Sequence, residues 1–446
     1  MANLLFVMFV RSAFLLAPNS LIVIEMTKTT ALLAALICVT GLFGPMARAA
    51  ETDDASVSRW AVNGFGTLGA AYHDEDDTRF RRSVDQRGGA REGQVEMRND
   101  SVLGVQVNGV LDSRWSVMAQ AVTRQDVDRK WTPQLTWAFV KYMPNDWSEF
   151  RFGRMAVDIY LDGESRHVGY VYTTVRPYAD VYGRLTFDTF DGVDGTFQRT
   201  LGPGLVRLKL FGGRTRGDIY LNDAVYALDK GRTFGATLDW VGEELSFKLS
   251  WGSMVTTRDA LNDPLRLGLI GAASLLPQPV AGQALARAGE ITQSNRISYL
   301  GLGVGWERGP FSLRVVGTDM SMTVYPGFEG WGLGATAAYR IGDWKPFVTY
   351  SRSILDPVER RLDLPAGAHP AIDALRAGWE EVNNYVRHDQ YTAGIGVRYD
   401  FTDNAALKLQ ADRIEAKRSS SLLDAAGNRT DARSFTVLSA TLDFVF

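Results

Sequence analysis

Segments of about ten residues, in which apolar side chains alternate with polar or small ones, recur from residue 60 to the end of the chain. In residues 391–401, for example, Tyr391, Ile395 and Tyr399 share one face, and small or polar residues occupy the other. A period of two residues predicts a β-strand with two different faces. Amphipathic helices that could cover so many apolar faces are not predicted. The sixteen predicted strands are 60–72, 101–111, 115–122, 135–143, 149–155, 191–199, 205–213, 232–241, 244–254, 296–307, 310–320, 329–341, 344–353, 389–401, 404–415 and 434–446.

The connections between these strands alternate between short and long. Short turns follow the even-numbered strands, as at 112–114 and 342–343, and hold residues such as Gly, Asp and Ser that favour turns. Long loops follow the odd-numbered strands. This layout is typical of an outer-membrane barrel, and the sheet must close because lipid offers no hydrogen-bond partner to an open edge. We therefore predict an all-β fold, a transmembrane antiparallel β-barrel of 16 strands with long extracellular loops.

The N-terminal region predicts export through a signal peptide. Lys28 forms a short basic region, residues 31–43 form an apolar run, and Ala47 and Ala49 fit a small-x-small cleavage site. We expect cleavage after Ala49 or the alanine that follows it. The predicted division of the chain is a signal peptide at 1–49 and a single outer-membrane β-barrel domain at 50–446.

A second apolar patch lies at 1–25, where Arg11 and Pro18 interrupt it. We interpret Met26 as the true start of translation, which would leave this patch untranslated. A retained membrane anchor is the alternative interpretation.

The last predicted strand ends on an aromatic residue. Phe446, Phe444 and Leu442 share one face, and Asp443 belongs to the other. With the signal peptide, the sixteen alternating strands and the long third loop, this strand resembles the Gram-negative general porin superfamily. The resemblance is architectural, covers residues 60–446, and includes no motif that is specific to one solute.

The resemblance implies an outer-membrane protein that contacts the lipid bilayer and lipopolysaccharide and assembles as a homotrimer. It also implies that Phe446 is an assembly signal for the outer-membrane assembly machinery, and that the third loop, 156–190, folds into the lumen and narrows the pore. This loop is rich in charges and tyrosines, which favours packing against a wall, and an ordinary surface loop is the alternative. The residues that we assign to this constriction loop are Asp158, Asp162, Glu164, Arg166 and Arg176.

Alternation also assigns charged strand residues to the lumen. A charge on the lipid face near the membrane midplane would cost about 2–4 kcal/mol. The basic residues that we assign to the pore wall are Arg151, Arg207, Lys209, Lys248, Arg314, Arg340 and Arg398. Fewer acidic residues point inward, which predicts a modest anion preference although the formal net charge is -3 at pH 7. Acidic residues of the third loop are the counter-argument, because they would make the constriction nearly unselective.

Motifs for chemistry are weak. Residues 64–69 spell G-x-G-x-x-G, but the predicted strand continues where a nucleotide site needs a helix. Asp162, Ser165 and His167 form a trio within one loop that chance would often produce. The acidic run 74–77, with the arginines that follow it, is interpreted as a solvated mixed-charge loop, and bridging of lipopolysaccharide phosphates is a minor alternative. We expect no enzyme activity, cofactor, metal site or nucleic-acid partner.

These observations favour a water-filled channel for passive diffusion of small hydrophilic solutes or ions, with a mild anion preference. The alternative is a plugged, structural or adhesive barrel that binds partners through its long loops. Loops 255–295 and 354–388 both hold short helix-like apolar stretches that suit this alternative. A stable open conductance level distinguishes the two.

Overall fold

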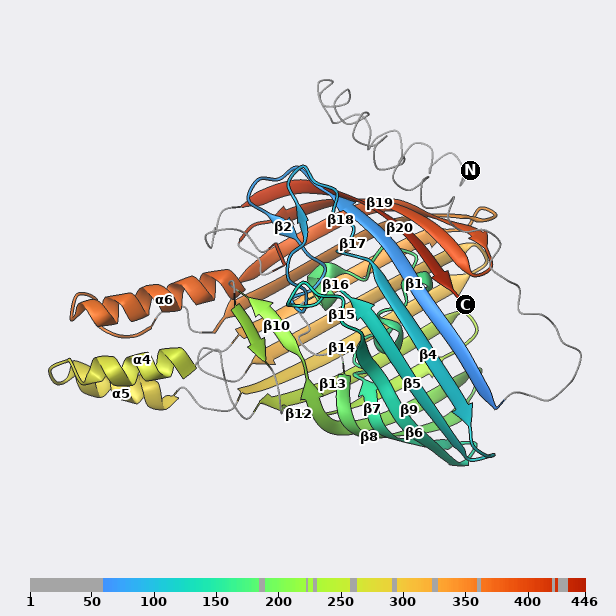
Figure 1. Ribbon diagram of the computed structural model, residues 1–446, viewed down its shortest axis with the longest axis horizontal. Coiled ribbons are helices and arrows are strands. Elements are labelled where there is room, and N and C mark those ends of the chain that lie inside the picture. Colours follow the sequence, from blue (N-terminus) through green and yellow to red (C-terminus); the bar gives the residue numbers. More distant parts are fainter. Residues whose placement is uncertain are drawn as a thin grey trace, which may run out of the picture. The chain divides into compact units, whose positions relative to one another are not determined.

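Sixteen antiparallel strands close into a barrel in the computed structural model (Figure 1). The structure describes residues 59–183, 189–221, 224–227, 231–256, 263–290, 295–322, 328–358, 362–418, 422–423 and 432–446, so the predicted signal peptide lies outside the described residues. The barrel strands are β1 (Trp60–Tyr72), β4 (Val102–Val110), β5 (Trp115–Arg124), β6 (Gln134–Asn145), β7 (Ser148–Ala156), β8 (Thr189–Leu201), β9 (Gly204–Arg216), β12 (Arg232–Val241), β13 (Leu245–Thr256), β14 (Asn295–Arg308), β15 (Phe311–Met322), β16 (Phe328–Tyr339), β17 (Trp344–Pro357), β18 (His388–Thr402), β19 (Ala405–Ala416) and β20 (Arg433–Val445).

The barrel closes at a seam where β1 pairs with β20. Phe65 lies opposite Val445 there, and Gly64 exchanges two backbone hydrogen bonds with Phe446, of 2.8 and 2.9 Å. The predicted sixteen-stranded barrel is confirmed, and each predicted segment coincides with one barrel strand. The ends differ most for β17, which continues to Pro357 where the predicted strand ends at 353.

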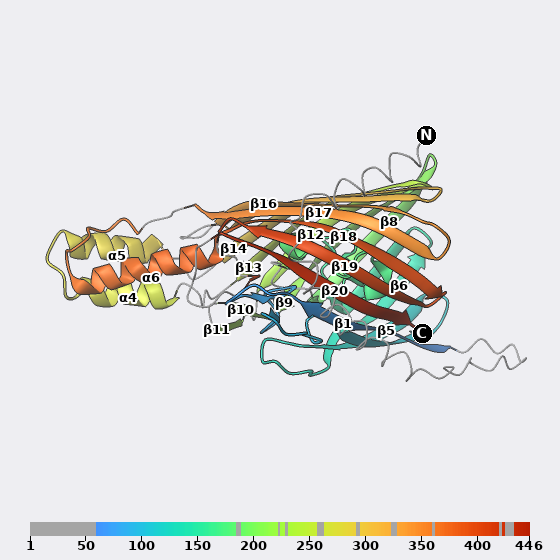
Figure 2. The same cartoon turned by 90° about the horizontal axis from the view of Figure 1, so that it is seen from above.

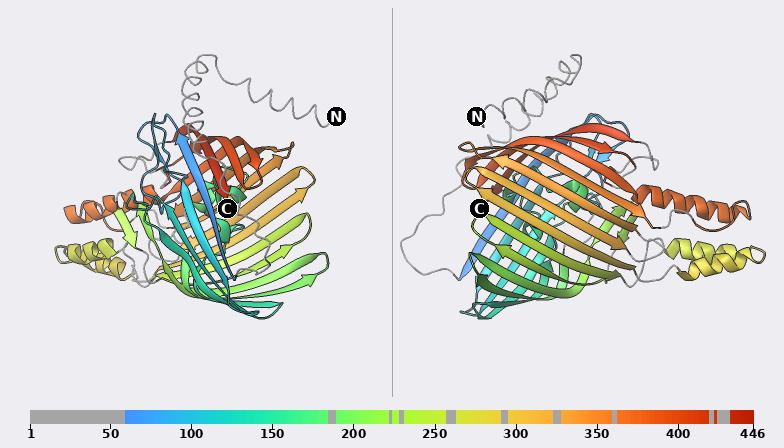
Figure 3. Two further views of the ribbon diagram at one scale, coloured as in Figure 1. Left: turned by 45° about the vertical axis from the view of Figure 1, so that its right-hand side comes forward. Right: turned by 180° about the vertical axis from the view of Figure 1, so that it is seen from behind.

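Alternate side chains of each strand point to opposite sides of the wall. In β9, Leu208 and Leu210 are 39% and 48% exposed, whereas Lys209 between them is only 8% exposed. An apolar outer band suits lipid, and polar residues face the interior. Figure 3 shows this wall of tilted strands from two further sides.

The short turns reverse the chain tightly. Gly309 between β14 and β15 has a φ of 56°, and Gly342 between β16 and β17 has a φ of 60°. Glycine adopts these left-handed conformations without the steric cost that a side chain brings. Such tight turns keep neighbouring strands in register at this end of the barrel.

The long loops carry additional elements. These are the hairpin strands β2 (Arg79–Phe80), β3 (Ala90–Arg91), β10 (Asp218–Leu221) and β11 (Ala224–Ala227), the short helices η1 (Gly163–Ser165), η2 (Gly169–Val171) and α3 (Ala179–Tyr182), and the longer helices α4 (Asp263–Ala273), α5 (Val280–Glu290) and α6 (Pro370–Val386). The helices α4, α5 and α6 (Figure 2) share one buried apolar cluster, which includes Leu269, Ala284, Ile372 and Trp379. None of the helices in the described ranges has the length and hydropathy needed to cross a membrane.

The first loop, between β1 and β4, folds onto other loops through its backbone. Arg81 N donates to Leu422 O at 3.1 Å, Val84 N donates to Gly183 O of the third loop at 2.8 Å, and Tyr220 N donates to Val84 O at 2.8 Å. The Arg81 side chain is fully buried and donates to Tyr220 O at 2.8 Å. The interpretation of this mixed-charge segment as a solvated loop is therefore wrong for Arg81, because neighbouring loops enclose it.

Candidate functional site

The third loop joins β7 to β8 and folds into the lumen, as predicted. Its described part, residues 157–183, bonds to side chains of β9 and β13 near its start. Further along, it bonds to side chains of β19 and β20. The loop therefore crosses the interior of the barrel between two anchors.

The first anchor is built around Asp158. Its carboxylate accepts from Lys209 Nζ of β9 at 2.6 Å and from Lys248 Nζ of β13 at 2.7 Å, so it bridges lysines of the two strands that flank β12. Ser250 Oγ donates to the neighbouring Ile159 O at 2.6 Å. All these groups are buried, and charge-assisted hydrogen bonds of this kind are short and strong. The anchor holds the start of the loop against the wall.

Glu164 extends this anchor. Its carboxylate accepts from Arg151 Nη2 at 2.7 Å and from Lys209 Nζ at 2.9 Å, and Arg151 also binds Asp194 at 2.5 Å. Burial alone would raise the pKa of Glu164, but Lys209 and Arg151 offset it, and the pKa lies well below its usual range. The carboxylate therefore remains charged and paired at neutral pH.

These contacts correct part of the predicted basic wall. Arg151, Lys209 and Lys248 are only 6%, 8% and 6% exposed, because the third loop covers them and neutralises them. They hold the loop and do not face an open path. Arg207 lies on the same face as Lys209 and is exposed, but it does not line the cavity described below. Strand alternation gives the face of a side chain correctly, but it does not reveal the acid that covers it.

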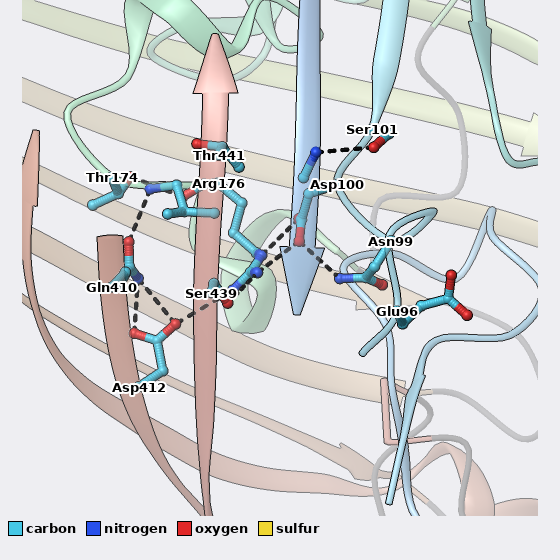
Figure 4. A network of polar contacts seen from close by, with 12 residues as sticks. Glu96, Asn99, Asp100, Ser101, Thr174, Arg176, Gln410, Asp412, Ser439 and Thr441 are labelled. Atoms are coloured by element: carbon cyan, nitrogen blue, oxygen red, sulfur yellow. Dashed lines mark hydrogen bonds and ion pairs between the residues drawn. The ribbon is translucent and has the colours of Figure 1, made fainter. Parts of the chain in front are cut away.

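Arg176 forms the second anchor (Figure 4). Its guanidinium donates to both oxygens of Asp100 at 2.7 Å each, to Ser439 Oγ at 2.6 Å and to Asp412 Oδ2 at 3.3 Å. Gln410 Nε2 donates to both oxygens of Asp412, at 2.7 and 2.9 Å. Arg176 is 5% exposed, and although burial lowers its pKa, Asp100 raises the pKa above its usual value. Arg176 is therefore a permanently charged, buried clasp.

Two further wall cations bind the backbone of the loop. Arg398 Nη1 donates to Tyr170 O at 2.6 Å and to Tyr172 O at 2.9 Å. Lys408 Nζ donates to Gly169 O at 2.7 Å. The predicted pore-wall residue Arg398 therefore holds the backbone of the third loop through one of its guanidinium nitrogens.

A cavity of about 320 Å³ lies between the third loop and the strands β14 to β18. Its volume falls within the range of small-molecule sites. Its charged lining residues are Arg314, Arg340, Lys345, Arg398, Asp162 and Glu307. The predicted residues Arg314, Arg340 and Arg398 come together here with Asp162 of the third loop. Lys345 of β17 lines the same cavity.

The charges of this cavity are only partly compensated. Arg314 pairs with Asp162, and Arg398 Nε donates to Asp400 at 2.6 Å. Lys345 makes no ion pair within the described part of the chain. The lining therefore carries a surplus of positive charge.

Tyrosines of the third loop form the opposite side of the cavity. Tyr170, Tyr172, Tyr178 and Tyr182 all contribute to its lining. Burial raises the pKa of Tyr178 to about 12, and it raises the pKa values of Tyr172 and Tyr182 well above their usual range. These phenols stay neutral at physiological pH, so they add polar contacts without negative charge.

Some anchoring residues escaped the sequence-based prediction. The third loop is bound by Gln410 and Asp412 of β19 and by Asp100, which precedes β4, and none of the three was assigned a role. Lys408, Gln410 and Asp412 occupy alternate positions of β19, so a run of polar side chains on the lumen face was the available signal. The predicted Arg166 lines a second, smaller cavity that is described further below.

Comparisons with known proteins agree with this architecture. A model of the Gram-negative porin family matches residues 30–419, whereas no curated protein matches the sequence. Similar solved structures include the outer membrane channel DcaP of Acinetobacter baumannii, which is 11% identical with a TM-score of 0.50 and coverage of 87% of this chain and 97% of that chain. They also include an anion-selective porin from Comamonas acidovorans, which is 12% identical with a TM-score of 0.48 and coverage of 87% and 100%.

At these identities the solved structures show likeness of fold alone. The family model, in contrast, spans well over half of the chain and includes most of the barrel. The resemblance drawn from strand alternation and loop lengths is confirmed by it. The chain belongs to the Gram-negative porin family and is an outer-membrane channel.

Proposed function

We propose that the channel passes small hydrophilic solutes by passive diffusion and modestly prefers anions. The observation that carries this proposal is the 320 Å³ cavity, which four basic side chains and two acidic ones line. In a narrow, low-dielectric passage such charges act strongly on a permeating ion. Acidic residues of the outer loops count for little, because mobile ions screen charges beyond roughly 8–10 Å at physiological salt.

Removing two of these cations should reduce the anion preference. We expect the double variant Arg340→Gln/Lys345→Gln to shift the reversal potential in a potassium chloride gradient toward the potassium equilibrium value. The reason is that Lys345 makes no ion pair in the described part of the chain and Arg340 shares Asp400 with Arg398. Planar-bilayer recordings with the purified protein provide the measurement.

The matched control removes the same number of positive charges outside the cavity. Arg114 and Arg308 are exposed and lie next to short turns, so Arg114→Gln/Arg308→Gln should leave the reversal potential nearly unchanged. Equal shifts in both double variants would mean that overall charge, not the cavity, determines selectivity. A wild-type barrel without any stable open level would favour the plugged or adhesive alternative.

The proposal includes no catalytic activity. The trio of Asp162, Ser165 and His167 is the strongest sequence candidate, and Arg314 already binds the Asp162 carboxylate. A catalytic relay needs a carboxylate that orients the histidine, and here the acid is engaged elsewhere. We also propose the remaining features that the porin resemblance implies: a homotrimer, contact with lipopolysaccharide, and a signal peptide at 1–49 that is cleaved to leave the barrel domain at 50–446.

We propose Phe446 as the assembly signal, and its ring should matter more than its backbone. The residue is 52% exposed and stacks with Phe444 at a centroid distance of 6.4 Å, while its backbone pairs with Gly64. The variant Phe446→Ala keeps those backbone bonds, and we expect it to lower the amount of protein in the outer membrane several-fold. Quantitative blotting of membrane fractions measures this, with Phe401→Ala as a control at an exposed phenylalanine near the end of β18. Normal levels of Phe446→Ala would reject the assignment.

A further inference from the structure

A second cavity, of about 40 Å³, lies where the first loop meets the third loop. Its polar lining includes Arg82 and Ser83 from the first loop, and Arg166 and Arg176 from the third. It shares Asp162, Tyr172, Pro177 and Tyr182 with the larger cavity, so the two spaces adjoin. Both loops begin at the long-loop end of the barrel.

Two of the arginines at this cavity lack an acidic partner. In the part of the chain that the structure describes, neither Arg82 nor Arg166 takes part in an ion pair. Nη1 of Arg166 is buried and forms no hydrogen bond. An unsatisfied buried donor on a charged group is costly, and native structures rarely leave one without a ligand or water.

The acids around this cavity already bind other arginines, and Asp162 of its lining binds Arg314. Asp85 binds Arg124 at 2.5 Å, and Asp100 binds Arg176 at 2.7 Å. Arg82 thus lies among charges that cancel in pairs, and its own charge is left over. Arg166 adds a second uncompensated charge close by.

The electrostatics of Arg82 agree with this geometry. Burial lowers the pKa of Arg82 to about 10, and repulsion from Arg124 and Arg166 contributes, while Asp100 and Asp85 only partly offset it. A depressed pKa on a guanidinium indicates a place where added negative charge would be stabilising. Tyr172 and Tyr182 stay protonated there and keep their hydroxyl hydrogens for donation.

We propose that Arg82 and Arg166 form a binding site for one oxyanion group, a phosphate, sulfate or carboxylate, at the entrance to the larger cavity. Paired guanidiniums suit such groups because their planar N–H donors match the spacing of the oxygens. A cavity needs about 10–15 Å³ to hold one water molecule. The second cavity, at about 40 Å³, therefore has room for a single anionic group and not for a whole organic solute. The remainder of a larger solute would lie in the adjoining cavity.

This site extends the proposed anion preference to oxyanions, and its location on the permeation route rests on the proposed function. The chloride preference arises from the basic wall of the larger cavity, whereas the oxyanion site depends on two different arginines. The two can therefore fail independently. An oxyanion that pauses here would compete with chloride for passage.

Inorganic phosphate is the probe for the test. Chloride current through the purified porin is recorded in planar bilayers free of lipopolysaccharide, with phosphate titrated at constant ionic strength. We expect saturable inhibition by phosphate, and we expect Arg82→Gln/Arg166→Gln to raise the half-inhibiting concentration at least about tenfold, as loss of charged hydrogen bonds implies. The exposed pair Arg91→Gln/Arg114→Gln removes the same charge elsewhere and should leave the half-inhibiting concentration unchanged.

Two further arms keep the result interpretable. Arg82→Lys/Arg166→Lys preserves charge and should retain inhibition with a weaker affinity, which guards against a folding defect in the Gln variant. A second set of recordings in bilayers that contain lipopolysaccharide identifies the source of the oxyanion. Loss of inhibition there means that lipid phosphate already occupies the site, and retained inhibition means that the site serves solutes.

The outcomes separate this proposal from the proposed function. The oxyanion site is overturned if phosphate does not inhibit the chloride current in a saturable way. It is also overturned if the Gln variant is inhibited at the same phosphate concentration as the wild type, even when the wild-type channel prefers chloride. Phosphate inhibition that depends on Arg82 and Arg166 in a channel without chloride preference supports the site and rejects the selectivity proposal.

Discussion

Replacing Arg176 with methionine is expected to destabilise the folded channel by about 3–5 kcal/mol, the usual cost of breaking a buried ion pair by removing one partner. The variant leaves Asp100 and Asp412 buried without their cation, and it also removes the hydrogen bond to Ser439. We expect the second half of the third loop to leave the wall. Single-channel conductance should then rise and become noisier, and the temperature of barrel unfolding should fall.

The control for this prediction is an ion pair of the same chemistry in a less buried place. Arg154 binds Asp191 at 2.6 Å, but the two side chains are 26% and 34% exposed. Arg154→Met should cost no more than about 1 kcal/mol, because exposed pairs contribute little. Comparable losses in both variants, measured by heat-dependent gel mobility or tryptophan fluorescence, would show that burial of the Arg176 cluster has no special effect.

Replacing Asp158 with asparagine is expected to cost about 3 kcal/mol and to loosen the start of the third loop. The change leaves the buried Lys209 and Lys248 with one carboxylate fewer, although Glu164 still binds Lys209 at 2.9 Å. The uncovered lysines add positive charge to the lumen. The same variant should therefore strengthen the anion preference while it lowers stability.

Asp239→Asn is the matched control for Asp158→Asn. Asp239 contacts the same Lys248, but at 3.3 Å and with a 20% exposed side chain. The charge change is identical in the two variants. The expected loss of stability is less than half that of Asp158→Asn, because the Asp239 carboxylate lies farther from Lys248 and is partly hydrated. If the two variants behave alike in unfolding and in reversal potential, the bridging position of Asp158 has no particular importance.

The barrel could be predicted from the sequence because its cause is local. The period of two residues and the turn residues around Gly309 and Gly342 act within a single hairpin. Each strand can therefore be recognised from its own residues, without knowledge of the rest of the barrel. The occupants of the lumen depend on distant contacts. Alternation places Lys209 inward, but only the path of the third loop brings Asp158 against it.

The same limit explains the arginines. Arg176 is one charged residue among many in a loop, and its partners lie far away in sequence and in three different parts of the wall. Arg82 gives no local signal either, because its importance comes from acids that bind other arginines. Electrostatic compensation is a property of the folded neighbourhood, and a linear pattern of charges does not contain it.

The clasp around Arg176 also has a consequence for the order of assembly. Asp100 precedes β4, Ser439 belongs to β20 and Asp412 to β19, and β1 lies between these contributors in the barrel. Strands from the two ends of the chain therefore supply one receptor for the loop. That receptor does not exist until the first and last strands have met, so the pore can be narrowed only in a barrel that has already closed. Docking of the third loop is therefore a late step of folding, and a docked loop indicates that the barrel around it has closed.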